Sequence, residues 1–139
     1  MTPPVVEFFR SATLGRLRVG ISASDIERHL GTAFSRTTYE VDTEVWKYGP
    51  LQLTILEGKL HRLKLDCLDE SRLPHVLQNV VVPSAKTTVY SLIDMLEEHD
   101  IDWQIDPAHS FERQLCLLTA SGVRAYFDLD HCELQSLQA

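Results

Sequence analysis

The alternation of apolar and polar residues over positions 46–65 predicts three short antiparallel strands. Leu51, Leu53 and Ile55 alternate with polar residues, the pattern expected when successive side chains of a strand point to opposite faces of a sheet. The segment 57–59 contains a glycine suited to a hairpin turn. The prediction is a half-buried hairpin with one polar face.

The same alternation assigns side chains to the two faces of this hairpin. Gln52 and Thr54 on the first strand, and Arg62 and Lys64 on the second, are expected to share the polar face. The second strand is expected to bury three side chains, those of His61, Leu63 and Leu65.

Three helices are predicted from periodicity and capping residues. The strongest spans residues 88–99, where apolar residues recur at i, i+3, i+4 and i+7 and a threonine precedes them. A second spans 22–30, with Ser22 and Asp25 in the spacing of a capping box. A third, short helix follows Thr2, which precedes a proline and is predicted to be its N-cap.

Further strands are predicted on both sides of the 88–99 helix. Residues 37–45 are rich in β-formers, with Asp42 as a candidate interruption, and Tyr39, Val41, Thr43 and Val45 would share a face of a continuous strand. Four strands are expected after the helix: 101–105, 115–119, 123–128 and 133–137. In the third of these, Arg124 and Tyr126 alternate with Phe127 and its apolar neighbours.

These elements predict an α+β fold with an antiparallel sheet of about seven or eight strands and short helices on one face. We expect a single domain, residues 1–139. Both halves of the chain show a helix followed by a meander. This pattern is consistent with tandem repeats over residues 14–66 and 84–139, joined by a linker over 67–83. It is equally consistent with a chance similarity, because any meander of alternating strands produces such a pattern.

Composition narrows the classes of partner. The chain has 13 basic and 20 acidic residues and a net charge of −7, which disfavours binding to nucleic acid or to anionic membranes. No apolar stretch is long enough to span a bilayer, so a cytoplasmic protein is expected. Cys67, Cys116 and Cys132 lack metal or redox spacing and are expected to be reduced, largely buried thiols. No metal or other cofactor is predicted.

Short motifs in the first half resemble a known repeat. These are Gly20 to Ile26 with Leu30-Gly31, followed by Trp46-x-Tyr48-Gly49 and the hairpin at Gly58. They are similar to the repeat of the β-lactamase inhibitor protein (BLIP) family and of the SmpA/BamE lipoprotein family, best over residues 14–66. The resemblance implies a protein-binding sheet surface without catalysis. The chain lacks the lipobox of the lipoprotein and the paired cysteines of the secreted inhibitor.

The leading functional hypothesis is a non-enzymatic, cytoplasmic protein-binding module, of inhibitor or immunity type, that acts through an open sheet face. Tyr126 is the exposed aromatic expected on that face, whereas Trp46 and Trp103 are expected in the core. The predicted partner-binding residues are Gln52, Thr54, Arg62, Lys64, Arg124 and Tyr126. No catalytic residue is predicted, and the partner is expected to be another protein.

Two alternatives are consistent with the same sequence. The first is a small enzyme or ligand-binding domain that uses Asp102, Asp106 and His109. Four residues would share one face of an extended strand here, Asp100, Asp102, Gln104 and Asp106, although a solvated helix end and strand face explains the same pattern. The second alternative is a homodimer closed through an exposed sheet edge or face.

Overall fold

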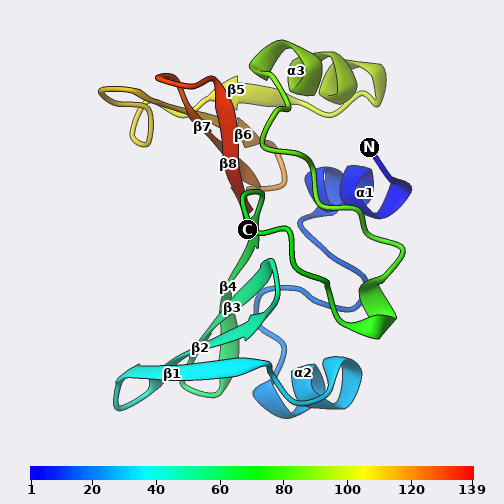
Figure 1. Ribbon diagram of the computed structural model, residues 1–139, viewed down its shortest axis with the longest axis vertical. Helices are drawn as coiled ribbons and strands as arrows, with labels where there is room; N and C mark the ends of the chain where they lie inside the picture. The colour runs from blue at the N-terminus through cyan, green and yellow to red at the C-terminus, as the bar shows by residue number, and fades with distance from the viewer.

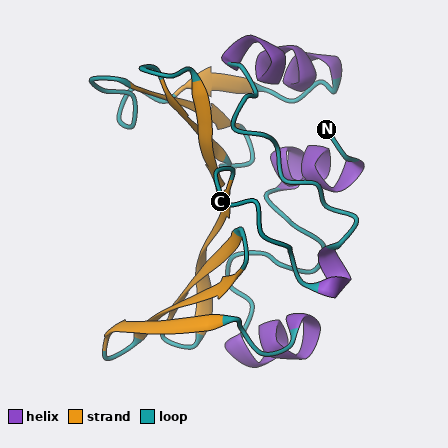
Figure 2. Ribbon diagram, viewed as in Figure 1, coloured by secondary structure: helices purple, strands orange, loops and turns teal.

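The eight strands of this chain form one antiparallel sheet, and all of the helices lie on one side of it (Figures 1 and 2). The computed structural model describes all 139 residues. The helical elements are α1 (Pro3–Ser11), α2 (Ala23–Leu30), the 3₁₀ turn η1 (His75–Leu77) and α3 (Val89–Glu98). The strands are β1 (Ser35–Glu40), β2 (Thr43–Tyr48), β3 (Leu51–Leu56), β4 (Lys59–Asp66), β5 (Trp103–Ile105), β6 (Gln114–Thr119), β7 (Arg124–Asp128) and β8 (Glu133–Gln138).

The strand order is β1-β2-β3-β4-β8-β7-β6-β5. Each half of the chain therefore forms its own four-stranded meander, preceded by α2 in the first half and by α3 in the second. The last strands of the two meanders, β4 and β8, meet at the centre of the sheet, and the first strands, β1 and β5, form its edges. This arrangement confirms the predicted α+β fold with a sheet of about eight strands.

The junction between β4 and β8 is short and symmetric. Lys64 pairs with Gln138, and Leu65 pairs with Leu137. On the other side of Lys64, Leu63 and Ala139 exchange two backbone hydrogen bonds of 3.0 and 2.8 Å. At the other end Asp66 pairs with Ser136, and the Cys67 N–H donates to the Gln135 carbonyl at 2.9 Å. The pairing is thus centred on Leu65 and Leu137, and a few backbone contacts join the two meanders into one sheet.

The two meanders carry a β-bulge at equivalent places. Between β3 and β4 the register steps from Thr54–Arg62 to Ile55–Leu60, which leaves His61 unpaired. Between β7 and β8 it steps in the same way, from Tyr126–Ser136 to Phe127–Leu134, and Gln135 is the extra residue. The repeated order and the repeated bulge agree with the predicted half-repeats, whose division of the chain remains a prediction.

The bulge in β4 corrects the prediction for His61. An extra residue in one strand shifts the alternation of its side chains beyond that point. His61 is therefore exposed, and Leu60 is buried in its place, while Leu63 and Leu65 face the core as predicted.

The hydrophobic core is a cluster of 29 buried residues between the helices and one face of the sheet. Helix α1 buries Phe8 and Phe9 in this layer. Trp46 is almost fully buried, as predicted, and Trp103 packs half-buried against the same cluster. One face of the sheet thus lies under the helices, and the other has no layer above it (Figure 2).

The predicted helix caps are partly right. The Ser22 hydroxyl accepts a hydrogen bond from the Asp25 backbone N–H at 3.2 Å, but the Asp25 carboxylate pairs with Arg28 and does not complete a capping box. Thr88 does form a capping box, with Ser91. Thr2 stands at the N-cap position of α1, yet its hydroxyl makes no capping hydrogen bond.

Two strand predictions were too long. Residues 37–45 do not form one strand, because the chain turns between β1 and β2 at positions 41 and 42. The four residues predicted to share a face are consequently divided between two strands and a turn. Strand β5 begins only at Trp103, because Asp100 adopts a positive φ of 54° after helix α3.

The central junction generates a stability prediction. Replacing the fully buried Leu65 by alanine should lower the free energy of unfolding by about 2–5 kcal/mol, because it leaves a cavity beside Leu137. The matched control is Leu56→Ala, at a partly exposed position at the end of β3, where a loss below about 1 kcal/mol is expected. Urea denaturation measures both, and equal losses would contradict the assignment of Leu65 to the core of the junction.

Candidate binding face

The sheet face opposite the helices carries one lateral row of residues that crosses every strand. We call this side of the sheet the open face. Strand register places in this row Ser35, Lys47, Gln52, Lys64, Gln138, Arg124, Leu118 and Gln104. Because neighbouring strands lie about 4.8 Å apart, the row is roughly 34 Å long. The open face is therefore an extended surface rather than a small pocket.

The six predicted partner-binding residues all lie on the open face. Gln52, Lys64 and Arg124 belong to the lateral row. Three residues lie beside the row: Thr54 and Arg62, which pair with each other, and Tyr126, which pairs with Ser136. The structure brings these residues to one surface, and their role in binding remains a prediction.

Lys47 is a member of this surface that the sequence prediction missed. It lies opposite Gln52 on β2 and is exposed. The signal was present in the sequence, since Lys47 stands between the two aromatic residues that β2 buries, Trp46 and Tyr48. Continuing the alternation through β2 would have placed Lys47 on the polar face.

Projecting segments bound the open face at both ends. In Figure 1, the β1–β2 hairpin at one end and the loops of the β5–β8 end at the other extend away from the helices. Both ends expose apolar side chains: Tyr39 and Val41 at the hairpin, the latter 97% exposed, and Phe111 and Leu129 at the other end. The polar floor of the sheet thus lies between two rims with exposed apolar groups.

Three cations on the open face form no ion pair, although Asp69 lies within electrostatic range of one of them, Lys47. Lys47, Arg62 and Lys64 take part in none of the seven ion pairs of the chain. The protein as a whole carries a net charge of −7, so the sign of these unpaired charges is opposite to that of the net charge. An acidic ligand would gain favourable electrostatic interactions here without breaking an existing pair.

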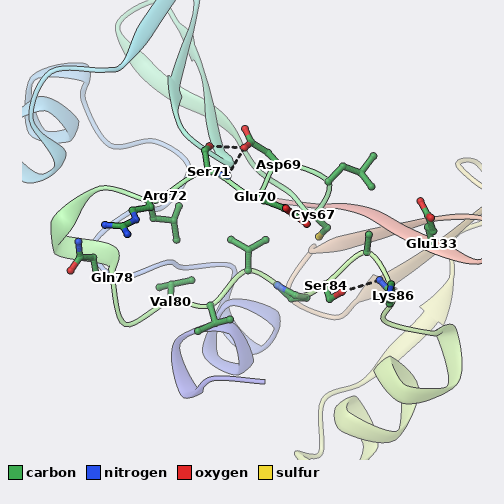
Figure 3. Close-up of a pocket in the computed structure, with 16 residues that line it drawn as sticks. Cys67, Asp69, Glu70, Ser71, Arg72, Gln78, Val80, Ser84, Lys86 and Glu133 are labelled. Carbon is green, nitrogen blue, oxygen red and sulfur yellow. Dashed lines mark hydrogen bonds between the residues drawn. The ribbon is translucent and has the colours of Figure 1, made fainter.

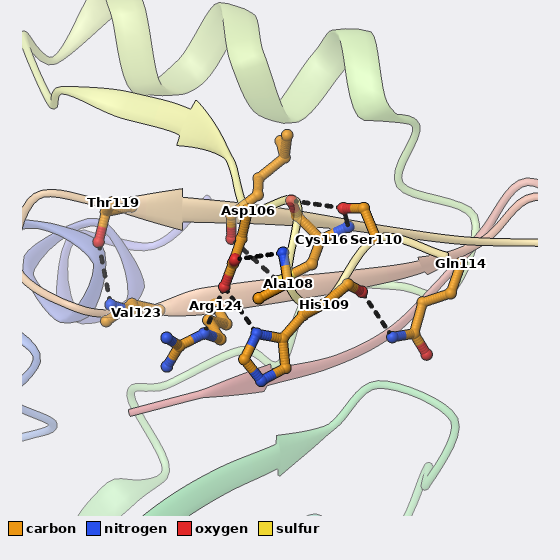
Figure 4. Close-up of polar contacts among 10 residues, drawn as sticks. Asp106, Ala108, His109, Ser110, Gln114, Cys116, Thr119, Val123 and Arg124 are labelled. Carbon is orange, nitrogen blue, oxygen red and sulfur yellow. Dashed lines mark hydrogen bonds and ion pairs between the residues drawn. The ribbon is translucent and has the colours of Figure 1, made fainter. Parts of the chain in front are cut away.

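A buried carboxylate holds two basic side chains at the β7 end of this surface (Figure 4). Asp106 Oδ2 accepts a hydrogen bond from Arg124 Nε at 2.9 Å and lies 2.8 Å from His109 Nδ1. Asp106 Oδ1 accepts the backbone N–H of Ala108 at 3.1 Å. The His109 ring in turn lies edge-on to Tyr126, with ring centroids 6.3 Å apart. We call Asp106, His109 and Arg124 the Asp106 cluster.

The local chain explains why Asp106 turns toward the sheet. Strand β5 ends at Ile105, and Asp106 donates its backbone N–H to the Cys116 carbonyl at 2.9 Å. Pro107 follows, and the carboxylate bonds the backbone two residues on, as in an Asx turn. The Asp106 side chain is only 8% exposed.

The predicted strand face of Asp100, Asp102, Gln104 and Asp106 is wrong, because β5 spans only Trp103–Ile105 and contains Gln104 alone of the four. Asp106 and His109 are in contact, whereas the Asp102 side chain is exposed and makes no hydrogen bond or ion pair. No group of three or more histidine, cysteine or acidic side chains is arranged to hold a metal ion.

Electrostatics stabilise the charged forms of the Asp106 cluster. The hydrogen bond from Arg124 is the main reason that the pKa of Asp106 is lowered, with His109 adding to it and burial opposing it. The same bond raises the pKa of Arg124. Burial raises the pKa of Tyr126, while the nearby charges of Arg124 and Arg62 lower it. Tyr126 therefore lies within the field of cations from both halves of the sheet.

The three cysteines are free, as expected, but differ in exposure. Cys67 and Cys116 are buried, and Cys132 is exposed in the β7–β8 turn, which corrects the expectation of burial for that residue. Burial raises the pKa of the Cys67 thiol to about 12 and that of Cys116 to about 11. Both are therefore protonated at neutral pH and poor nucleophiles.

A further cavity lies along the linker between the two halves (Figure 3). It is an open groove of about 770 Å³, lined mainly by residues 67–73 and 78–86. Its charged side chains are mixed, with Asp69, Glu70 and Glu133 on one hand and Arg72 and Lys86 on the other. None of the residues predicted to bind a partner or ligand lines this groove.

Comparison with protein-family models, with curated proteins and with solved structures gave no match to this chain. The resemblance to the BLIP and SmpA/BamE repeat therefore stays a prediction. None of the helices is long and apolar enough to cross a membrane.

The lowered pKa of Asp106 generates a pH prediction. Its ionised form stabilises the fold above the unfolded pKa of about 3.9, and this contribution is lost as pH falls through the lower folded pKa. Asp106→Asn should therefore be less stable than wild type at pH 6, and the difference should shrink toward about pH 2. Urea midpoints measured across this range test it. Asp102→Asn is the control, and a difference for Asp106→Asn that is independent of pH would contradict the assignment.

Proposed function

We propose that this protein is a non-enzymatic binding module that occludes an acidic surface of a partner protein with its open face. The observation that carries the proposal is the set of unpaired cations Lys47, Arg62 and Lys64 on an uncovered sheet face of an acidic protein. Positive groups without internal partners favour a negatively charged ligand and speed its approach.

The dimensions of the open face support a macromolecular partner. A row of roughly 34 Å suits a protein surface or a long segment better than a metabolite. The exposed apolar residues at the two ends, such as Val41 and Phe111, would add contact area around the polar floor. Covering a partner's functional surface in this way is how an inhibitor or immunity protein acts without chemistry of its own.

The enzyme alternative draws support from one contact, the 2.8 Å approach of His109 Nδ1 to Asp106. An aspartate that orients a histidine occurs in catalytic sites, where the histidine acts on a nucleophile or substrate. Here the same carboxylate oxygen also bonds Arg124, and no side-chain hydroxyl or thiol hydrogen-bonds to His109. A role of the Asp106 cluster in recognition accounts for these contacts better than a role in catalysis.

Reversing the unpaired charges tests the proposal. Wild-type protein, used as bait in an extract of the native cell, identifies a partner, which is then purified for titration. The double variant Arg62→Glu, Lys64→Glu should bind that partner about tenfold more weakly or worse, because Arg62 is exposed, Lys64 is half-exposed and neither forms an ion pair within the chain.

The matched control is Arg16→Glu, Arg18→Glu, which makes the same change of net charge at two exposed positions between α1 and α2. This control should bind as wild type does. Unchanged binding of the open-face variant, or equal losses in both variants, would contradict the proposal. Light scattering of the free wild-type protein tests the homodimer alternative, which predicts twice the mass of 15.8 kDa.

A further inference from the structure

The Asp106 cluster contains donor groups that the protein itself leaves unused. Arg124 gives only its Nε to Asp106, and its two terminal nitrogens make no hydrogen bond within the chain. The side chain is 36% exposed, although the carboxylate that holds it is nearly buried. The guanidinium is therefore fixed at one edge and free at another.

His109 is held in the same way. Its Nδ1 is directed at Asp106, so the ring presents Nε2 on the side away from the carboxylate (Figure 4). In the protonated imidazole, Nε2 is a hydrogen-bond donor. The His109 ring also lies edge-on to Tyr126. The Asp106 carboxylate therefore holds Arg124 and His109 directly, and it supports the Tyr126 ring through His109.

The surroundings of this cluster are positive. Arg62 is close enough to Tyr126 to influence its titration, and Lys64 is two strands away from Arg124 in the lateral row, through Gln138. Asp106 is the only carboxylate that influences the pKa of Arg124, and the arginine balances its charge. Two further carboxylates, Asp66 and Asp128, lie on the same face on the far side of Tyr126 and Ser136. A group that entered beside Arg124 would meet cations from β4 as well as from β7.

We infer that Asp106 is a positioning residue that holds Arg124 and His109 as a preformed binding site for a carboxylate of an acidic polypeptide segment. This inference rests on the proposed function and names the chemical group that the open face recognises. The two terminal nitrogens of an arginine match the two oxygens of a carboxylate in a planar, bidentate pair. Fixing the guanidinium beforehand lowers the entropy that the pair loses on binding.

Charge and positioning predict opposite effects for one substitution. Asp106→Asn removes a negative charge from the open face, so an effect of net charge alone would tighten the binding of an anion. If Asp106 acts by positioning, the same variant binds more weakly, because Arg124 and His109 lose the group that orients them. Asp128→Asn is the matched control, since Asp128 also contacts a histidine three residues on, His131 at 2.9 Å, but no arginine.

The experiment is an NMR titration of the full chain with N-acetylated, C-amidated hexaglutamate and with the corresponding hexaglutamine. In wild type, hexaglutamate should shift the Arg124 Nε–H signal and the amide signals of residues around Tyr126, and hexaglutamine should not. Asp106→Asn should weaken binding about fivefold or more, and Asp128→Asn should leave it unchanged or slightly tighter. Amide spectra of each free variant establish that it is folded.

Three results would overturn the inference. The first is tighter or unchanged binding by folded Asp106→Asn, and the second is an absence of shifts at Arg124 in wild type. The third is tighter binding of inorganic phosphate than of hexaglutamate at the same signals, which would assign the site to a phosphate group. In any of these cases, the double variant Arg62→Glu, Lys64→Glu is compared with wild type for binding to the purified partner. If the variant binds the partner more weakly, the proposed function stands and only the carboxylate site fails.

Discussion

The pairing of β4 with β8 is the contact on which the rest of the structure depends. Each meander alone would expose a strand edge at the position where the other meander now pairs. The junction uses few residues and is centred on the buried pair Leu65 and Leu137. Because β4 and β8 pair in antiparallel fashion through their C-terminal parts, the two meanders extend in opposite directions from the junction. A single long face results, with its polar row continuous across the junction.

That continuity explains how residues from distant parts of the chain form one surface. Arg62 and Lys64 come from the first half, and Arg124 and Tyr126 come from the second. Strand register aligns them because the pairing is regular across the junction, where Lys64 pairs with Gln138 and Gln138 pairs with Arg124. Both bulges lie farther from the junction than these four residues. The helices cover the opposite face, which leaves this one free for a partner.

Much of the fold follows from period-two alternation and helix capping, and the errors have physical causes. The prediction for His61 failed because it carried strict alternation through β4, although Leu60 and Leu63 are three residues apart, the spacing that a bulge produces. The strand over 37–45 was too long because its residues favour extended structure on both sides of the turn at Asp42. The Asp106 cluster was only partly predicted. The pairing of Asp106 with Arg124 joins a loop to a strand 18 residues later, and such a contact depends on tertiary structure.

The electrostatic pattern of the open face connects this architecture to the proposed function. Lys47 and Lys64 belong to the lateral row, while Lys86 lines the groove along the linker. Reductive methylation of lysines, measured by mass spectrometry with and without the bound partner, compares these positions directly. The account predicts that the partner protects Lys47 and Lys64 and leaves Lys86 as reactive as in the free protein. Protection of Lys86 with undiminished labelling of Lys47 and Lys64 would place the partner in the groove and contradict the account.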